Sequence, residues 1–235
     1  MEVYNKTGVT KSGAVRVTKA IGALNFKTSA ALTTETIKLY VERSNGDNVI
    51  ICEADTLLKD FIDLSVFDEG AIHVYESQIQ SAITELGLNG VIPLASNEAV
   101  VIELDNLVAL NTYVVNGIEF PAVASAIHLF ESKRVLDDEK RREFNVRAYD
   151  LVKFNNFDKV RNVMLQYGQN RVNYTPSEFI ALALDLSPAN TYDTYLGEVR
   201  TTSNYASLVF PIIGVDIIEI EKIKGTVDML LKGTF

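Results

Sequence analysis

Two pairs of carboxylates are the side chains of this 235-residue chain whose type and spacing best suit chemistry. Glu103 and Asp105 stand two residues apart in an alternating segment, and so do Glu219 and Glu221. Residues two apart on a strand share one face, so each pair has the spacing for acid–base catalysis or Ca²⁺ binding. We favour a solvated outer sheet face opposite buried Val, Ile and Leu, because the pairs stand at matching places in the repeat described below.

The other nucleophiles and bases are few. Cys52 is the sole cysteine, which excludes an intrachain disulfide and a multi-cysteine zinc site. It ends the apolar run Val49–Ile51, a predicted buried strand in which a thiol acts as a small apolar group. His73 and His128 lack ligand spacing, and His73 lies in a predicted strand as a structural residue. No phosphate-binding, dinucleotide or Gly-x-Ser-x-Gly motif occurs. We therefore expect no catalytic residue, no metal site, no cofactor and no enzyme activity.

The charge of the chain is unevenly distributed. Lys plus Arg is 22 and Asp plus Glu is 31, a net charge of −9, which argues against a surface that neutralises nucleic acid throughout. Residues 1–34 differ, because Glu2 stands there against five bases: Lys6, Lys11, Arg16, Lys19 and Lys27. This segment is either a solvated, loosely structured arm or an arm placed against an anionic surface such as lipid headgroups or packaged nucleic acid.

A strand, turn, strand and helix follow one another in the first half. Residues 37–42 alternate as a half-buried strand, and 44–48 contain the Asn-Gly step of a hairpin turn. Residues 49–54 form the returning strand, and Asp55 is the expected N-cap of a helix. One face of that helix carries Leu57, Leu58, Phe61 and Ile62.

The same order recurs in the second half, with strand 161–167, turn 168–170, strand 171–174 and a capping box at 175–178. The helix face there carries Phe179, Ile180, Ala183 and Leu184. Gly46–Ser65 aligns with Gly168–Ser187 without a gap. Such an internal repeat predicts two successive domains of one plan.

Further alternating segments complete each half, at 98–105 and 107–115 in the first and at 215–221 and 226–231 in the second. Many short strands with turn signals predict an all-β fold with short helices, built as two tandem jelly-roll β-sandwich domains. The charge-dense segment between the halves indicates a connector. The expected boundaries are 1–34 for the basic arm and first strand region, 35–132 for jelly roll 1, 133–143 for the connector and 144–235 for jelly roll 2.

The chain shows no sign of export or of a membrane span. Met1–Lys6 lacks the charged start and apolar run of a signal peptide, and no apolar run reaches the roughly 18 residues of a spanning helix. We expect a protein made in the cytoplasm and kept or assembled there.

The duplicated order of elements resembles the double jelly-roll major capsid proteins of tailless icosahedral bacteriophages with an internal membrane. The likeness is greatest to the short capsid proteins of corticoviruses and of the small phages of Flavobacteriia-type hosts (Finnlakeviridae). The segments that carry it are 37–42, 45–48 and 55–64, their counterparts 163–167, 168–170 and 178–186, and the ending Gly233-Thr234-Phe235.

The resemblance implies a structural protein without catalysis. Such proteins form homotrimers of pseudo-hexagonal outline, tile an icosahedral shell over an internal lipid membrane, and contact penton and minor membrane-associated capsid proteins. It implies a protein of the virion, assembled in the host cytoplasm, without direct sequence-specific nucleic-acid binding. The bases implied to face anionic lipid headgroups are Lys6, Lys11, Arg16 and Lys19.

Two other function classes remain open. A phage spike or other receptor- or carbohydrate-binding β module would use the polar segment 190–205, expected to be an exposed loop, in which Tyr192, Tyr195 and Tyr205 offer rings for stacking. A glycosidase would use Glu103 or Glu219 in a pocket that raises the pKa of the carboxyl. The capsid interpretation instead predicts a trimer of three times 26.0 kDa.

Overall fold

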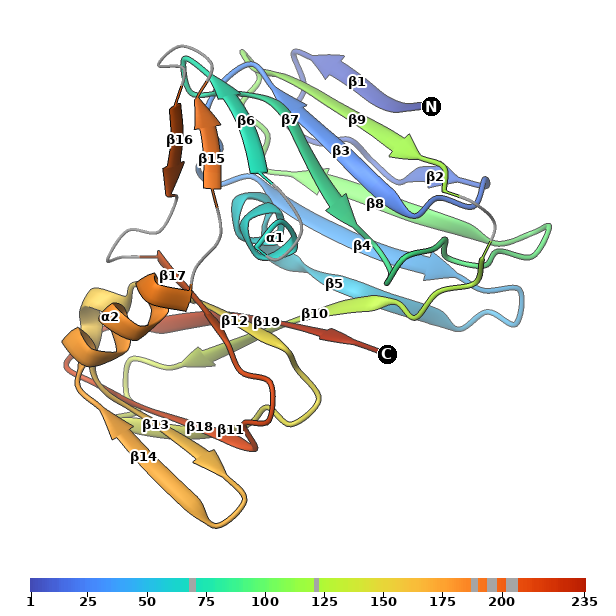
Figure 1. The fold of residues 1–235 in the computed structure, drawn as a ribbon. Coiled ribbons are helices and arrows are strands. Elements are labelled where there is room, and N and C mark those ends of the chain that lie inside the picture. Colours follow the sequence, from blue (N-terminus) through green and yellow to red (C-terminus); the bar gives the residue numbers. More distant parts are fainter. Residues whose placement is uncertain (68–70, 121–122, 187–189, 194–197, 202–206) are drawn as a thin grey trace. The chain divides into compact units, whose positions relative to one another are not determined.

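The computed structural model describes the chain except for residues 68–70, 121–122, 187–189, 194–197 and 202–206 (Figure 1). It divides into two compact units. The first comprises Met1–Phe130, Ala189–Thr201 and Thr234–Phe235, and the second comprises Glu131–Pro188 and Thr202–Gly233. No helix of the described residues is long and apolar enough to cross a membrane.

The first unit is a sandwich of two sheets with one helix, α1 (Leu58–Ser65). One sheet holds, in spatial order, β1 (Glu2–Thr7), β9 (Thr112–Ile118), β3 (Ala23–Thr28) and β7 (Gln78–Glu85), continued by β6 (Ala71–Tyr75), β15 (Asn190–Asp193) and β16 (Glu198–Thr201). The other sheet holds β2 (Val15–Val17), β8 (Ala99–Asp105), β4 (Thr36–Glu42) and β5 (Asn48–Leu57).

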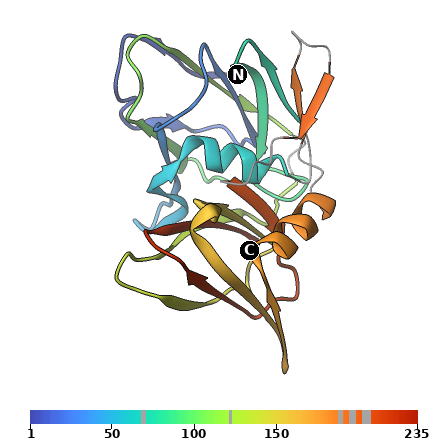
Figure 2. The same ribbon diagram turned by 90° about the vertical axis from the view of Figure 1, so that its left-hand side faces the viewer.

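The second unit is built in the same way, with the helix α2 (Pro176–Leu186) and a short 3₁₀ turn, η1 (Phe157–Lys159). One sheet holds β10 (His128–Val135), β19 (Val227–Thr234), β12 (Leu151–Asn155) and β17 (Ser207–Pro211). The other holds β11 (Arg141–Asn145), β18 (Ile217–Lys222), β13 (Val160–Tyr167) and β14 (Asn170–Tyr174). The β13–β14 hairpin forms the edge of the unit (Figure 2).

The two units share one strand order. We call the eight strands β1–β5 and β7–β9 the first roll, and the eight strands β10–β14 and β17–β19 the second roll. In each roll the first, eighth, third and sixth strands form one sheet, and the second, seventh, fourth and fifth form the other. This is the order of a jelly roll, and in both rolls the helix follows the fifth strand. The prediction of two tandem jelly rolls is confirmed.

The predicted repeat corresponds to the fourth strand, the fifth strand and the helix of each roll. The capping box is present, since Thr175 N–H donates to Glu178 Oε2 at 2.8 Å and Glu178 N–H donates to Thr175 Oγ1 at 3.4 Å. The expected N-cap at Asp55 is wrong: β5 continues through Leu57, because Thr36 and Ile37 still pair with Leu57 and Thr56, and α1 begins at Leu58.

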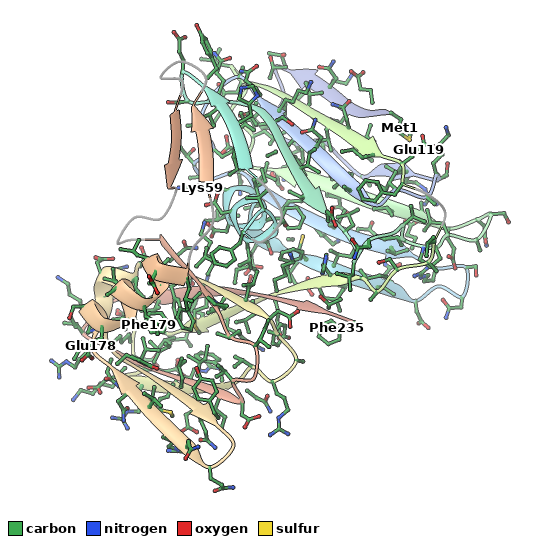
Figure 3. All side chains as sticks on the ribbon, in the orientation of Figure 1. Met1, Lys59, Glu119, Glu178, Phe179 and Phe235 are labelled. Carbon is green, nitrogen blue, oxygen red and sulfur yellow. The ribbon has the colours of Figure 1, made fainter. Side chains whose placement is uncertain are left out.

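A cluster of aromatic rings fills the second roll around α2. Phe179, at the first turn of the helix (Figure 3), is fully buried and lies 4.5 Å from Phe210 and 5.5 Å from both Phe154 and Phe157, measured between ring centroids. Tyr174 completes the cluster at 6.0 Å. The helix therefore closes the sandwich by inserting one ring between the sheets.

Three expectations about individual segments are corrected. The segment 133–143 is no connector, because it holds the end of β10 and the start of β11, two strands of the second roll. Residues 1–34 are no loose arm, because they contain β1, β2 and β3, each paired in a sheet. The expected loop 190–205 contains β15, which pairs in parallel with β6 and carries Tyr192; Tyr195 and Tyr205 lie outside the described residues.

Candidate functional site

An acid stands immediately before the seventh strand of each roll and ties together the loops at that end. In the first roll it is Glu98, which is 8 % exposed. It accepts hydrogen bonds from Ala95 N–H at 3.0 Å, Ser44 N–H at 3.1 Å and Arg43 Nη1 at 2.9 Å. The backbone donors of Ala95 and Ser44, with Arg43, lower the pKa of Glu98 to about 2. Arg43 Nη1 also donates to Pro93 O at 2.7 Å, so the arginine is enclosed by its own chain.

Asp216 takes this place in the second roll. It accepts hydrogen bonds from Arg147 Nε and from Gly168 N–H, each at 2.7 Å, and the bond from Arg147 is the main reason why its pKa is lowered. Beside it opens a pocket of about 270 Å³. The lining residues are Asn145, Arg147, Gln166, Gly168, Gln169, Asp216 and Ile217. This open corner is the candidate binding site of the described chain.

The predicted carboxylate pair of the first roll is partly exposed, and each of its two acids has a lysine partner. In the first roll Lys38 Nζ lies 3.5 Å from Glu103, and Lys11 Nζ lies 2.8 Å from Asp105. When Glu98 and Asp216 are aligned as equivalent positions, Glu103 corresponds to Glu221. The carboxylate pairs of the two rolls are therefore offset by two residues and do not occupy matching positions. Glu103 and Asp105 therefore form surface ion pairs with lysines, which is the ordinary use of such residues.

Glu219 departs from the expected solvated face. It is 8 % exposed, and in the strand register it stands directly opposite Glu143. Burial raises the pKa of Glu219, Glu143 raises it further, and the positive charge of Arg141, whose Nε lies 3.3 Å away, acts against this. A raised pKa is what the glycosidase interpretation requires, but Glu219 does not line the described pocket. Nowhere in the described residues do three acid, histidine or cysteine side chains gather as a metal site.

Replacing Glu219 by Gln should stabilise the protein at neutral pH. A raised pKa means that ionising Glu219 costs the folded state more than the unfolded state, and this cost grows as the pH rises above about 4.5. We expect Glu219→Gln to raise Tm by about 1–3 °C at pH 7 and to leave it unchanged near pH 4, measured by thermal denaturation. A lower Tm at pH 7 would show that the bond to Arg141 outweighs the burial of the carboxylate.

The four bases proposed to face a membrane are not gathered in one place. Lys6 lies on β1 opposite Tyr113, at the start of β9, whereas Lys19 pairs with Glu119, just after the end of β9, at 3.5 Å. A strand of this length separates the two by roughly 20 Å. Lys11 pairs with Asp105 and Arg16 with Glu42, so three of the four positive charges have a carboxylate partner.

The remaining predicted residues have structural surroundings. Cys52 is fully buried on β5, and burial raises the pKa of its thiol, which fits the predicted apolar role. His73 lies on β6 in register with Ser81. His128 is buried at the start of β10, with Nδ1 3.0 Å from Thr234 Oγ1.

Glu35 is one of the buried polar groups that the sequence did not predict. Glu35 accepts hydrogen bonds from Tyr113 Oη at 2.6 Å and from the N–H groups of Thr33 at 2.6 Å and Thr34 at 3.0 Å. Burial alone would raise the pKa of Glu35, but the bonds from Tyr113 and the two N–H groups lower it below its usual value. Tyr113 Oη in turn accepts from Val108 N–H, so Glu35 secures the loop before β9.

Comparisons with known proteins give only distant likenesses. No protein-family model and no curated protein matches the chain. Among solved structures, the mavirus major capsid protein is 7 % identical with a TM-score of 0.38, covering 100 % of this chain and 86 % of that one. The exported protein XepA of PBSX is 9 % identical with a TM-score of 0.22 at the same coverage. An archaeal virus protein with a triple jelly-roll fold is 10 % identical with a TM-score of 0.24, covering 98 % of this chain and 58 % of that one. The assignment of the jelly-roll fold therefore rests on the strand order of the two rolls.

Proposed function

We propose that this protein is a structural shell protein, a major capsid protein whose trimers tile an icosahedral virus shell over a lipid membrane. The observation that carries the proposal is the presence of two rolls of identical strand order in one chain. Two similar rolls in each of three chains give a capsomer with six similar sides. Such a capsomer packs like a hexagon while it keeps the closed symmetry of a homotrimer.

The surroundings of the acids support a role without catalysis. Glu98 and Asp216 are bound to arginines and backbone N–H groups within the loops that they join. Glu103 and Asp105 are paired with lysines on a sheet face. Residues in these positions hold loops and strands together, as a shell protein requires. The glycan-binding alternative depended on Tyr192, Tyr195 and Tyr205 in an exposed loop; Tyr192 lies in β15 rather than in a loop, and Tyr195 and Tyr205 lie outside the described residues.

In this proposal the partners are further copies of the chain, penton and minor membrane-associated capsid proteins, and an internal membrane. The protein is then a component of the virion that assembles in the host cytoplasm. It needs no cofactor and no sequence-specific contact with nucleic acid, in keeping with its net charge of −9.

The mass of the purified protein in solution tests the proposal. Native mass spectrometry should find a species of three times the 26.0 kDa of the chain. A stable monomer at every concentration would contradict it, since a monomer has no self-interface from which to build a capsomer.

The N-terminal bases provide a separate test of membrane contact. If Lys6, Lys11, Arg16 and Lys19 bind anionic headgroups, their joint replacement by Gln should weaken binding to liposomes, each charge near such a surface contributing about 1 kcal/mol. Unchanged liposome binding and unchanged assembly would show that these four bases do not contact lipid.

A further inference from the structure

The surroundings of the acid before the seventh strand differ between the rolls. The loops around Glu98 in the first roll cover its arginine partner, whereas those around Asp216 in the second roll leave a pocket open. The first roll has a long loop at 86–98 between β7 and β8, and Pro93 of that loop covers Arg43, whose side chain is 22 % exposed. In the second roll the loop between β17 and β18 is only 212–216, and the side chain of Arg147 is 76 % exposed. The two arginines are not at equivalent positions, since Arg43 follows the fourth strand of its roll and Arg147 follows the second. Of the two, Arg43 donates to a carbonyl of the loop before the seventh strand, at Pro93, whereas Arg147 contacts that loop through Asp216.

Among the residues that line the open pocket, Arg147 supplies most of the hydrogen-bond donors, because Gly168 N–H already donates to Asp216 and Gln166 Nε2 to Gly168 O. A guanidinium has five N–H donors, and the bond from Arg147 to Asp216 uses the one on Nε. Asn145 Oδ1 accepts from Arg147 N–H at 3.2 Å, so the amide nitrogen of Asn145 points the other way. Arg171 brings a second guanidinium, since its Nε donates to Gln166 Oε1 at 2.9 Å. A ligand that binds Arg147 in this pocket must therefore present acceptor oxygens.

The acids near the pocket are already engaged. Asp216 is held by Arg147 and Gly168, and Glu143 lies 3.9 Å from Arg171. The charges of these two carboxylates and of the guanidiniums of Arg147 and Arg171 nearly cancel. Binding of a ligand therefore depends on the directions of the N–H donors rather than on net charge. A phosphate oxygen suits such a site, because arginine donates to it through parallel N–H groups.

An exposed aliphatic side chain lies in the same short loop as Asp216. Ile213 is 74 % exposed in the tight turn that leads into Asp216, where Gly214 has a positive φ of 81°. Donors for a phosphate beside an aliphatic side chain are typical of a protein that rests on a lipid surface. A nucleic acid would instead need a run of bases along its backbone, which the described part of this corner does not provide.

We propose that this corner of the second roll binds the phosphate of a phospholipid headgroup, with Arg147 donating to the phosphate oxygens and Ile213 inserted at the boundary with the acyl chains. The source of the lipid rests on the proposed function, a shell over a membrane. The proposal adds that the end of the second roll carrying the loops 146–150, 168–169 and 212–216 faces the lipid.

Co-sedimentation with vesicles of equal parts phosphatidylcholine and phosphatidylglycerol tests this site in the full chain. We expect Arg147→Gln and Ile213→Ser each to weaken binding about fivefold to tenfold, roughly the loss of one charge-assisted contact or one inserted side chain. Matched controls are Arg161→Gln, an exposed arginine on β13 of the same roll, and Ile223→Ser, an exposed isoleucine in the loop after β18. Both variants should bind like the unchanged protein. Equal losses for Arg147→Gln and Arg161→Gln would overturn the site, because binding would then follow total charge alone.

Titration with inorganic phosphate separates a lipid site from a site for free phosphate. In NMR spectra, phosphate should shift the amide signals of Gly168 and Gln169 weakly, and Arg147→Gln should abolish the shift while Ile213→Ser preserves it. If Ile213→Ser also leaves vesicle binding intact, or if an oligonucleotide displaces the vesicles, the lipid assignment is wrong. If the protein forms trimers but Arg147→Gln does not weaken vesicle binding, this lipid site is wrong and the shell proposal is unaffected. If the protein is a monomer and Arg147→Gln weakens vesicle binding, the shell proposal is wrong and the lipid site is supported.

Discussion

Replacing Phe179 by Ala should lower the free energy of unfolding by about 3–5 kcal/mol, the usual cost of removing a buried aromatic ring. The loss is expected at the upper end because the ring touches four others, those of Phe154, Phe157, Phe210 and Tyr174. These partners come from separate strands and from η1, so the cavity cannot close by moving one element. Urea denaturation followed by circular dichroism measures the effect.

Leu184→Ala is the matched control on the same helix. Leu184 is 43 % exposed, and the predicted helix face that included it is only partly buried, so its truncation should cost less than about 1 kcal/mol. Equal costs for the two variants would mean that an exposed side chain of the helix stabilises the fold as much as the buried ring does. The account of one ring closing the sandwich would then fail.

Replacing Glu98 by Gln should destabilise the first roll in a way that depends on pH. The pKa of Glu98, lowered to about 2, means that the folded state favours the ionised carboxylate. This stabilisation is complete above the ordinary value of about 4.5 and is lost as the pH falls from there towards 2. We expect a clear fall in Tm for Glu98→Gln at pH 7 and a difference that shrinks steadily below pH 4.5.

Glu53→Gln provides the control for Glu98, since Glu53 is an exposed acid on β5. Its replacement should leave Tm unchanged at both ends of this pH range. If Glu98→Gln shows the same Tm difference at pH 7 and pH 3, its effect comes from shape rather than charge. The hydrogen bonds from Arg43, Ser44 and Ala95 would then not be the cause of the stabilisation.

The parts of the fold that local patterns predict are those whose partners are close in sequence. The hairpin of β13 and β14 and the cap of α2 are formed by neighbours along the chain, so alternation, turn residues and the capping box predict them. The parallel pairing of β15 with β6 joins Asn190 to Ala71, far apart in the chain, and leaves no local periodicity. The segment 133–143 has the composition of a connector because β10 and β11 expose charged residues on their outer faces.

The candidate site was less predictable than the fold for the same reason. Asp216 and Arg147 come from different loops, and no sequence spacing relates them. The burial of Glu219 depends on Glu143 and Arg141 of the adjacent strand, whereas its own strand shows only an alternating acid. The internal repeat is the sequence feature that could have indicated the site. When the strands of the two rolls are aligned, Glu98 and Asp216 occupy the same position, and the loop before the seventh strand is seen to be shorter in the second roll.

Electron microscopy of the assembled protein tests most directly whether the two jelly rolls of each chain serve to build a closed protein shell. Averaged images should show threefold particles of six-sided outline, joined edge to edge in curved layers or complete spheres, with both halves of each subunit recognisable as matching lobes. Images of single, isolated subunits under every assembly condition, or of rings whose lobes do not match, would contradict it.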